Sequence, residues 1–400
     1  MENNNQMSRK TFLILLRGAA FLALVLILTP RILDYFRQPD EEETVVGYNV
    51  GTDLAIVKTV VEEGMVTLGE VTQPYQMLEV TMLEGDYAGI PFIIEYGTRQ
   101  IRNDMIMLQE GERILVTVSS APDGTLTAYF TDFYRRNSLL LLAGIFVAAS
   151  ILISGWKGVR SLMGILLSLA VIVLIVLPGI QQGRDPLSIS ILGSFFFVGF
   201  SLYIIYGWTV KTHAAVLGSF LALAITGVLA YVFVNHSSLT GYGDENMFFI
   251  SQLTQNTLNV RSLLLAGVLI GTLGVLDDLV ISQASAVFEL FRNKPDQSFA
   301  TLYKSAMNIG QDHIAATVNT LVLAYAGASL PMLLLFSFRN VDYRLAINLE
   351  FIAEEIVRTM VGSLGLFAAV PITTALASFI AIHYRQLGGN VKTYLGPLNE

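Results

Sequence analysis

The amino-acid sequence predicts a membrane-embedded α-helical bundle of about eight transmembrane helices with an inserted small β-barrel or β-sandwich domain. Composition is the first observation behind this prediction. Hydrophobic residues make up 53% of the chain, charged residues only 14%, and the mean hydropathy is +0.59. These values lie outside the range of ordinary soluble domains. The lipid bilayer is therefore the expected surroundings of most of the chain.

The N-terminal residues 1–37 are predicted to form an uncleaved transmembrane anchor. An apolar run over residues 11–28 follows Arg9 and Lys10. A signal peptide would end in a small-x-small cleavage site, whereas this run ends in Thr29-Pro30-Arg31. The basic residues before the run place the N-terminus in the cytoplasm.

The second observation is a change of pattern over residues 40–135. Short alternating runs with β-branched residues, separated by turns such as Pro122-Asp123-Gly124, replace the long apolar runs. The segment holds 17 acidic and 5 basic residues, a balance of −12, while the whole chain has a net charge of −8. Such a surface suits an extracytoplasmic domain and argues against nucleic-acid binding. Strands are expected at 53–60, 75–82, 90–96, 113–118 and 125–130.

The third observation is a series of long apolar runs after residue 135. Each has about the length that a hydrocarbon core of ~30 Å requires. Their loops satisfy the positive-inside rule on balance, which predicts a multi-pass membrane protein with its N-terminus in the cytoplasm. With the anchor they give eight crossings, assigned as follows: helices two to five within 138–234 (138–156, 160–179, 187–206 and 212–234), an extracytoplasmic loop at 235–260, helices six to eight within 261–386 (262–288, 312–337 and 359–384), and a cytoplasmic tail at 387–400.

Helix six is apolar enough to cross a bilayer, yet it contains the adjacent carboxylates Asp277 and Asp278. A carboxylate in hydrocarbon must face protein or a water-filled cavity, and small residues let another helix approach closely. The helical repeat therefore predicts a stripe that points into the bundle. Its members share one face: Gly267, Gly271, Gly274, Asp278, Ser282, Ser285 and Glu289.

Helices seven and eight supply further polar candidates. Asn308, Asp312 and Asn319 share a face of helix seven, and their topology puts them near the cytoplasmic side with the acids of helix six. Helix eight begins on the outer side with gating candidates, where Glu354 and Arg358 have the spacing of an i,i+4 ion pair. The outer-side candidates are Glu354, Glu355 and Arg358, and the helix-packing candidates of this helix are Gly362 and Gly365.

Three runs of these helices resemble the YibE/F-like family of bacterial membrane proteins: LGVLDDLVISQASAVFEL, SAMNIGQDHIAATVNTLVLAYAGASLPMLLL and EEIVRTMVGSLGLFAAVPIT. Similarity extends to LEGDYAGIPF, LQEGERILVTV and TDFYRRNSLLLL before the membrane segment. The resemblance implies a multi-spanning inner membrane protein with an extracytoplasmic β domain, often regarded as a transporter. Members commonly have GAxMDxxxS in helix six, which aligns with Asp277, whereas the stripe singles out Asp278. Both alternatives stay open at this point.

The function favoured by these features is a secondary transporter or transport accessory. Intramembrane carboxylates can bind a proton or a metal cation and couple its passage to an ion or small-molecule substrate. The alternative is a structural polar network, in which Asp312 acts as a helix N-terminal acid. In each of these cases the lipid bilayer is an expected partner of the protein.

A second class is a non-catalytic scaffold or receptor whose β domain binds an envelope partner by strand addition. The Gly267-xxx-Gly271 spacing is also compatible with a homo-oligomer, although a contact within the bundle is the favoured explanation.

Enzymatic activity is not expected. The Gly241-Tyr242-Gly243-Asp244 sequence has the GxGD form of intramembrane aspartyl proteases, but a polar turn between helices explains it better. The chain has no Cys and only four dispersed His, so the sequence predicts neither a metal site nor a cofactor.

Overall fold

The computed structural model describes residues 52–99, 101, 106–120, 125–255, 257–338, 342–384, 392 and 395–397. The chain forms two compact units, Met1–Ala149 and Ser150–Glu400. The predicted anchor at 1–37 and most of the predicted tail at 387–400 lie outside the described residues.

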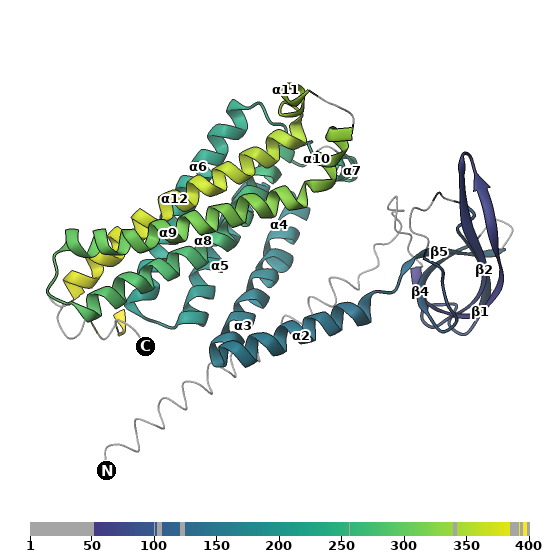
Figure 1. Cartoon of the computed structure of the whole chain (residues 1–400), viewed down its shortest axis with the longest axis horizontal. Helices are drawn as coiled ribbons and strands as arrows, with labels where there is room; N and C mark the ends of the chain where they lie inside the picture. The colour runs from purple at the N-terminus through teal and green to yellow at the C-terminus, as the bar shows by residue number, and fades with distance from the viewer. Residues whose placement is uncertain are drawn as a thin grey trace, which may run out of the picture. The chain divides into compact units, whose positions relative to one another are not determined.

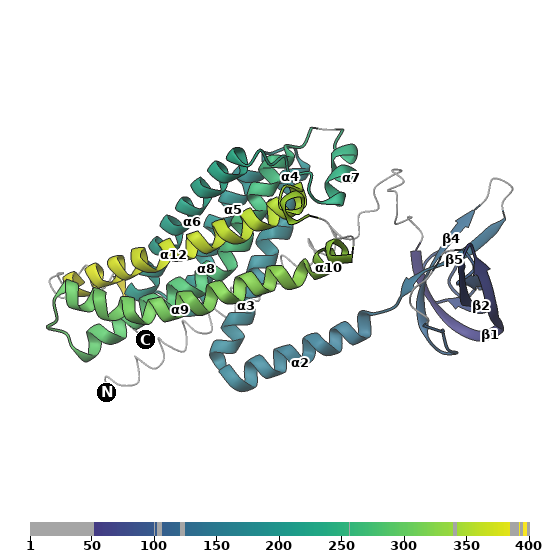
Figure 2. The same cartoon turned by 45° about the horizontal axis from the view of Figure 1, so that its top comes forward.

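The first unit contains one antiparallel sheet with the strand order β3-β2-β1-β4-β5, which curls as Figure 2 shows. All five strands expected from the alternating pattern are present. The curl brings the rings of Tyr96 on β3 and Phe130 on β5 to a centroid distance of 4.8 Å. The strands are β1 (Thr52–Leu68), β2 (Val71–Met82), β3 (Pro91–Tyr96), β4 (Arg113–Ser120) and β5 (Leu126–Phe133).

The core of this sheet follows from its period of two, because alternate residues of each strand point to the same face. Leu78 and Val80 on β2 and Ile114 and Val116 on β4 are completely buried. Each such side chain contributes roughly 1.5–3 kcal/mol relative to its exposed state. The alternation in the sequence thus predicts which side chains the core of the sheet buries.

The β1–β2 hairpin is longer than predicted and extends beyond its neighbouring strands. β4 pairs with β1 only at 52–56, and β3 pairs with β2 only at 76–81. The rest of the hairpin is a two-stranded ribbon that turns at Gly69, whose φ of +64° suits glycine.

The described residues after β5 are helical, and the first of these helices crosses the boundary between the two units. Six of the described helices are long and apolar enough to cross a membrane, or seven if α9 and α10 together form one bent span. The spans by this criterion are α2, the stretch from α3 to α4, α5, α6, α8 and α12. The helical elements are α2 (Arg136–Ser154), α3 (Trp156–Val171), the π-helix η1 (Ile172–Val176), α4 (Leu177–Gln181), α5 (Pro186–Tyr206), α6 (Val210–His236), α7 (Glu245–Leu253), α8 (Val260–Asn293), α9 (Phe299–Ala328), α10 (Leu330–Phe338), α11 (Tyr343–Ala346) and α12 (Glu350–Tyr384).

Two predicted helix boundaries are wrong by several residues. The seventh helix was expected at 312–337, but α9 begins at Phe299, where the side chain of Ser298 accepts a hydrogen bond from the backbone N–H of Thr301. The eighth was expected at 359–384, but α12 begins at Glu350. Hydropathy detects only the apolar part of a helix, whereas the N-cap determines where the backbone begins to coil.

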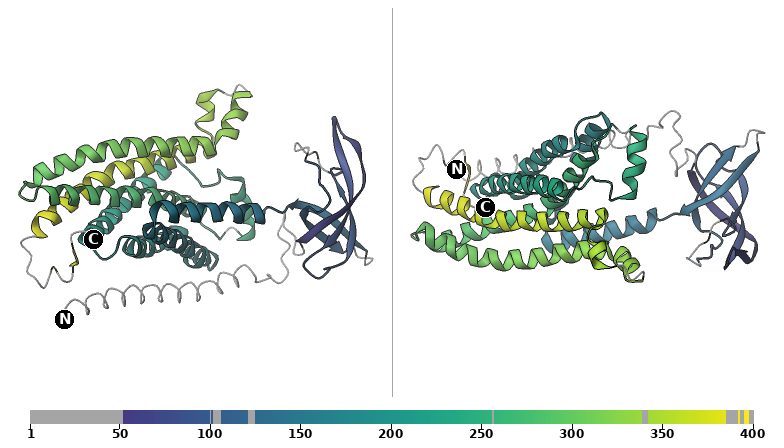
Figure 3. Two further views of the ribbon diagram at one scale, coloured as in Figure 1. Left: turned by 60° about the horizontal axis from the view of Figure 1, so that its bottom comes forward. Right: turned by 90° about the horizontal axis from the view of Figure 1, so that it is seen from above.

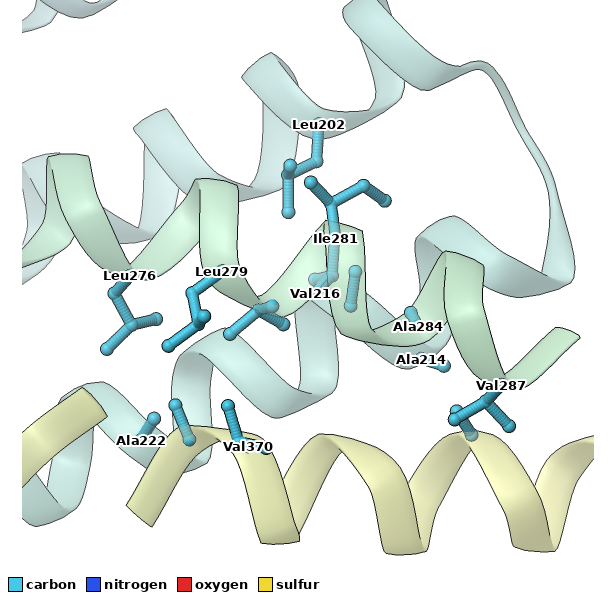
Figure 4. Packing of buried hydrophobic residues seen from close by; sticks show 14 of the residues in the cluster. Leu202, Ala214, Val216, Ala222, Leu276, Leu279, Ile281, Ala284, Val287 and Val370 are labelled. Carbon is cyan, nitrogen blue, oxygen red and sulfur yellow. The ribbon is translucent and has the colours of Figure 1, made fainter. Parts of the chain in front are cut away.

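Helix α8 lies at the centre of the bundle and contacts α5, α6, α9 and α12 (Figure 1). Leu202 of α5 points toward Ile281 of α8 in Figure 4, which also shows small residues such as Ala214 and Ala222 on α6. Small side chains allow the helix backbones to approach closely. The interior of the bundle is consequently tightly packed around α8.

Candidate functional site

The central feature of the bundle is a buried carboxylate midway along α8. Asp277 is 9% exposed, and the hydroxyl of Ser219 on α6 donates a hydrogen bond to its Oδ1 over 3.3 Å. Among the described residues, no Lys, Arg or His side chain forms an ion pair with Asp277. A buried carboxylate with one hydroxyl partner and no cation is an expensive arrangement.

The neighbouring Asp278, one residue further around the helix, lies on the exposed side of α8. The glycines of the same stripe are exposed as well, and a Cβ atom added to Gly267 or Gly274 would meet nothing within 4 Å. The prediction that this stripe points into the bundle is therefore wrong. Hydrophobic residues of α8 fill the interior instead, because apolar contacts between helices are as favourable as contacts with lipid tails.

Gly271 is the member of the stripe with a near neighbour, since its added Cβ would lie 3.3 Å from the hydroxyl of Tyr325 on α9. Ser282 is half-buried. Of the two acids that the sequence left open, Asp277 is the buried one and Asp278 is the exposed one.

The polar candidates of α9 do not join Asp277. Asn308, Asp312 and Asn319 are all exposed. The buried side of α9 carries Leu302, Ala306, Gly310, Ile314 and Leu321 instead. The two carboxylate stripes predicted for helices six and seven therefore do not form one buried site.

A buried amide that the sequence analysis passed over connects three helices. The Nε2 atom of Gln283 on α8 donates to the carbonyl of Ala306 on α9 over 2.9 Å and to the hydroxyl of Thr374 on α12 over 2.7 Å. Gly310 makes room for this side chain, because its added Cβ would lie 2.9 Å from Gln283 Oε1. Gln283 lies three residues after Val280 and four before Val287, both buried, and this place on an apolar face is the signal that could have identified it.

The acids at the start of α12 hold the loop that contains the GxGD sequence. Glu354 Oε1 accepts from the backbone N–H of Gly243 over 3.1 Å, and Glu350 Oε1 accepts from that of Gly241 over 2.9 Å. Asp244 caps α7 by accepting from the N–H of Asn246. These contacts give the four residues a structural role in a loop, as the turn interpretation expects.

The predicted ion pair between Glu354 and Arg358 is wrong. Arg358 Nη1 pairs instead with Glu355 Oε2 at 3.0 Å, one turn apart at i,i+3. The carboxylate of Glu354 is directed to the loop amide, so it is not available to Arg358.

The candidate packing glycines of α12 lie at close helix contacts. A Cβ added to Gly365 would lie 2.1 Å from the hydroxyl of Thr226 on α6, and one added to Gly362 would lie 3.2 Å from the hydroxyl of Thr272 on α8. No group of three or more His, Asp or Glu within the described part of the chain is arranged to hold a metal ion.

Comparison with known proteins gives one match. The family model of the YibE/F-like proteins matches residues 142–383, a range that begins within α2 and ends within α12. The five-stranded sheet lies outside it. No curated protein and no solved structure matches the chain significantly. The match and the six apolar helices indicate a membrane protein. Because the matched range exceeds half of the chain and contains the bundle around Asp277, the protein belongs to the YibE/F-like family.

Proposed function

We propose that this protein is a proton-coupled secondary transporter of the bacterial inner membrane, with Asp277 as its proton-binding site and its N-terminus in the cytoplasm. The observation that supports the proposal is the burial of Asp277 midway along the central helix, with the Ser219 hydroxyl as its hydrogen-bond partner. A carboxyl group in such surroundings is stable when a proton or a cation cancels its charge.

The choice of a proton over a metal cation follows from the ligands available. Calcium takes six to eight oxygen ligands, and magnesium requires a near-octahedral shell. Asp277 and Ser219 offer two side chains, and no other acid lies in a metal-binding group with them in the described residues. A proton needs only the carboxylate itself.

The position of Asp277 also suits a coupling role. Its helix contacts four others, so a shift of α6 relative to α8 changes the contact with Ser219 and the access of water to the carboxylate. Proton binding would favour the packed arrangement, and proton loss would favour a hydrated one. The sequence contains no Walker A motif, so an ATP-driven pump would need a separate subunit.

The test is proton flux into vesicles that contain the purified protein and a pH-sensitive dye. Flux driven by an imposed potential should be lost in Asp277→Asn, because the amide cannot release a proton. The matched control is Asp278→Asn, the adjacent residue with the same chemistry on the exposed side of α8. It should retain most of the flux, and both variants should elute and unfold as the native protein does. Equal flux in the native protein and Asp277→Asn would contradict the proposal.

A second candidate function is a scaffold whose β domain binds an envelope partner. The edges of the β1–β2 hairpin favour it, because within the described residues β1 after Val57 and β2 before Gln76 pair as strands only with each other. Val61 and Met65 are 55% and 63% exposed on this ribbon. An extended peptide could add to such an edge. If deletion of residues 58–75 causes the same cellular phenotype as loss of the whole protein, while Asp277→Asn causes none, the scaffold is the better description.

A further inference from the structure

An apolar groove lies between α9, α10 and α12, away from Asp277. Its volume is about 730 Å³, within the range of small-molecule sites. Apolar side chains dominate its walls, and Met360 and Leu364 of α12 are 63% and 43% exposed there. The main lining residues are Val322, Met332, Phe351, Ile356, Met360 and Phe367.

The bend between α9 and α10 creates the groove. α9 ends at Ala328, and α10 departs from its direction by 59°, as the green helices in Figure 3 show. One end is closed where Phe336 of α10 stacks on Phe351 of α12 with ring centroids 5.8 Å apart. The opposite end is marked by Phe367. The groove therefore runs along the axis of α12.

The part of the groove between Glu355 and Phe367 is about as long as one leaflet of a bilayer. Along α12 it extends from Phe351 to Phe367, and its charged lining residue is Glu355. At a rise of ~1.5 Å per residue, the distance from Glu355 to Phe367 is about 18 Å. Half of a ~30 Å hydrocarbon core is about 15 Å. A chain that begins at Glu355 would thus end near the middle of the membrane.

The charged lining residue, Glu355, has a cation beside it at the head of the groove. Glu355 lines it and pairs with Arg358 over 3.0 Å, and the two side chains keep 25% and 31% exposure. The Nε atom of Arg358 is buried without a hydrogen-bond partner in the part of the chain that the structure describes. Because the guanidinium and the carboxylate are both partly exposed, a ligand with an anion and a cation of its own can contact the pair.

We propose that this groove binds a phospholipid with a primary ammonium headgroup, taken from the leaflet in which α12 begins. The ammonium contacts Glu355, the phosphate oxygens accept from the guanidinium of Arg358, and one acyl chain fills the apolar channel between α9 and α12. The proposal is independent of the proton site, because it uses other residues on other helix faces.

The test uses vesicles that contain the purified full-length chain and a phospholipid with a photoactivatable diazirine in its acyl chain. Two probes with the same chain are compared, phosphatidylethanolamine and phosphatidylglycerol, since only the first has an ammonium group. Labelling of α9 and α12 peptides around Met360 by the first probe should exceed that by the second about tenfold, the ratio that one charge-assisted contact supports.

Matched variants locate the site. Met360→Trp and, independently, Leu364→Trp should lower the labelling about tenfold by filling the groove. Leu323→Trp is the control, because Leu323 is 62% exposed on α9 but is not among the lining residues. Glu355→Gln should abolish the preference for the ammonium lipid and leave labelling by the other probe unchanged.

Three outcomes overturn the proposal. Equal labelling by the two probes would mean that lipid tails touch the groove without headgroup recognition. Labelling no stronger around Met360 than around Leu323 would mean that the groove holds no preferred lipid. The chain has no native Cys, so Met360→Cys also reports on a second copy. A disulfide between two chains at this position would assign the groove to a protein interface.

Discussion

The helical bundle buries acidic side chains, whereas the buried polar side chains in the described part of the β domain are neutral. The sheet buries the neutral side chain of Gln76, which accepts from the N–H of Leu108 and donates to its carbonyl. The bundle buries a carboxylate, Asp277, with a 3.3 Å hydrogen bond from Ser219. Within the described residues, Glu354 is the other buried acid, and it accepts from a loop amide. In the described part of the chain, Asp277 therefore lacks the backbone hydrogen bonds that Gln76 and Glu354 receive.

The largest expected effect comes from a change of charge sign at the two adjacent acids. Asp277→Lys places an ammonium group among apolar residues that cannot neutralise it, and it should lower the free energy of unfolding by about 3–5 kcal/mol. Asp278→Lys should cost far less, because that side chain is exposed. Thermal unfolding of both variants in the same detergent measures the difference. Equal losses would mean that the two sides of α8 are not as different as the structure shows.

The next effect tests whether a buried amide matters as much in the bundle as in the sheet. Gln283→Ala removes the hydrogen bonds to Ala306 and Thr374 and leaves a cavity, so it should cost about 2–3 kcal/mol. Gln311→Ala, on the exposed surface of α9, should stay within about 0.5 kcal/mol. Thermal unfolding of both variants in the same detergent again measures the difference in stability. A neutral Gln283→Ala would show that the three helices do not depend on this contact.

Glycine substitutions compare a close helix contact inside the bundle with the exposed stripe of α8. Gly365→Ala would place a Cβ atom 2.1 Å from the Thr226 hydroxyl, which already donates to the carbonyl of Ala222. It should therefore cost about 1–3 kcal/mol. Gly274→Ala meets nothing within 4 Å and should gain up to about 1 kcal/mol from helix propensity. A loss of stability in Gly274→Ala would indicate that another surface covers the stripe.

The strands were predictable because one local property determines them. In β2 and β4, alternate residues such as Leu78 and Val80, or Ile114 and Val116, are those that the core buries. Turn residues then fix where each run stops. The extension of the β1–β2 hairpin was missed because its far half pairs only with itself, and its exposed residues follow no burial pattern.

The site was less predictable, because the direction of a helix face depends on which helices surround it. Sequence spacing correctly groups Gly267, Gly274 and Asp278 on one face, but it does not say whether that face is inside. The rule that acids face inward selected Asp278, and the neighbouring Asp277 satisfies it instead. Resemblance to the family pointed to Asp277 from a different kind of information, the position of an acid within a motif.

The smallest expected effect concerns Asp53 of the β domain, a partly exposed carboxylate that lies near other carboxylates. Burial, and then the carboxylates of Asp86 and Glu84, raise the pKa of Asp53 above its ordinary value of 3.8. The folded domain therefore binds this proton more tightly than the unfolded chain does. The resulting stabilisation is complete below pH 3.8 and is lost as the pH rises through the raised pKa.

Asp53→Asn should remove that part of the pH dependence, and screening at the surface keeps the difference below about 1 kcal/mol. Protection of the β1 amides from hydrogen exchange, corrected for the intrinsic exchange rate at each pH, measures it in the full-length protein. Other carboxylates titrate in both proteins, so the difference between native and Asp53→Asn profiles isolates this residue. Parallel profiles of the native protein and Asp53→Asn would show that water already stabilises the charged carboxylate of Asp53 in the folded domain. In that case the contrast with Asp277, for which the structure offers one hydroxyl, would become sharper still.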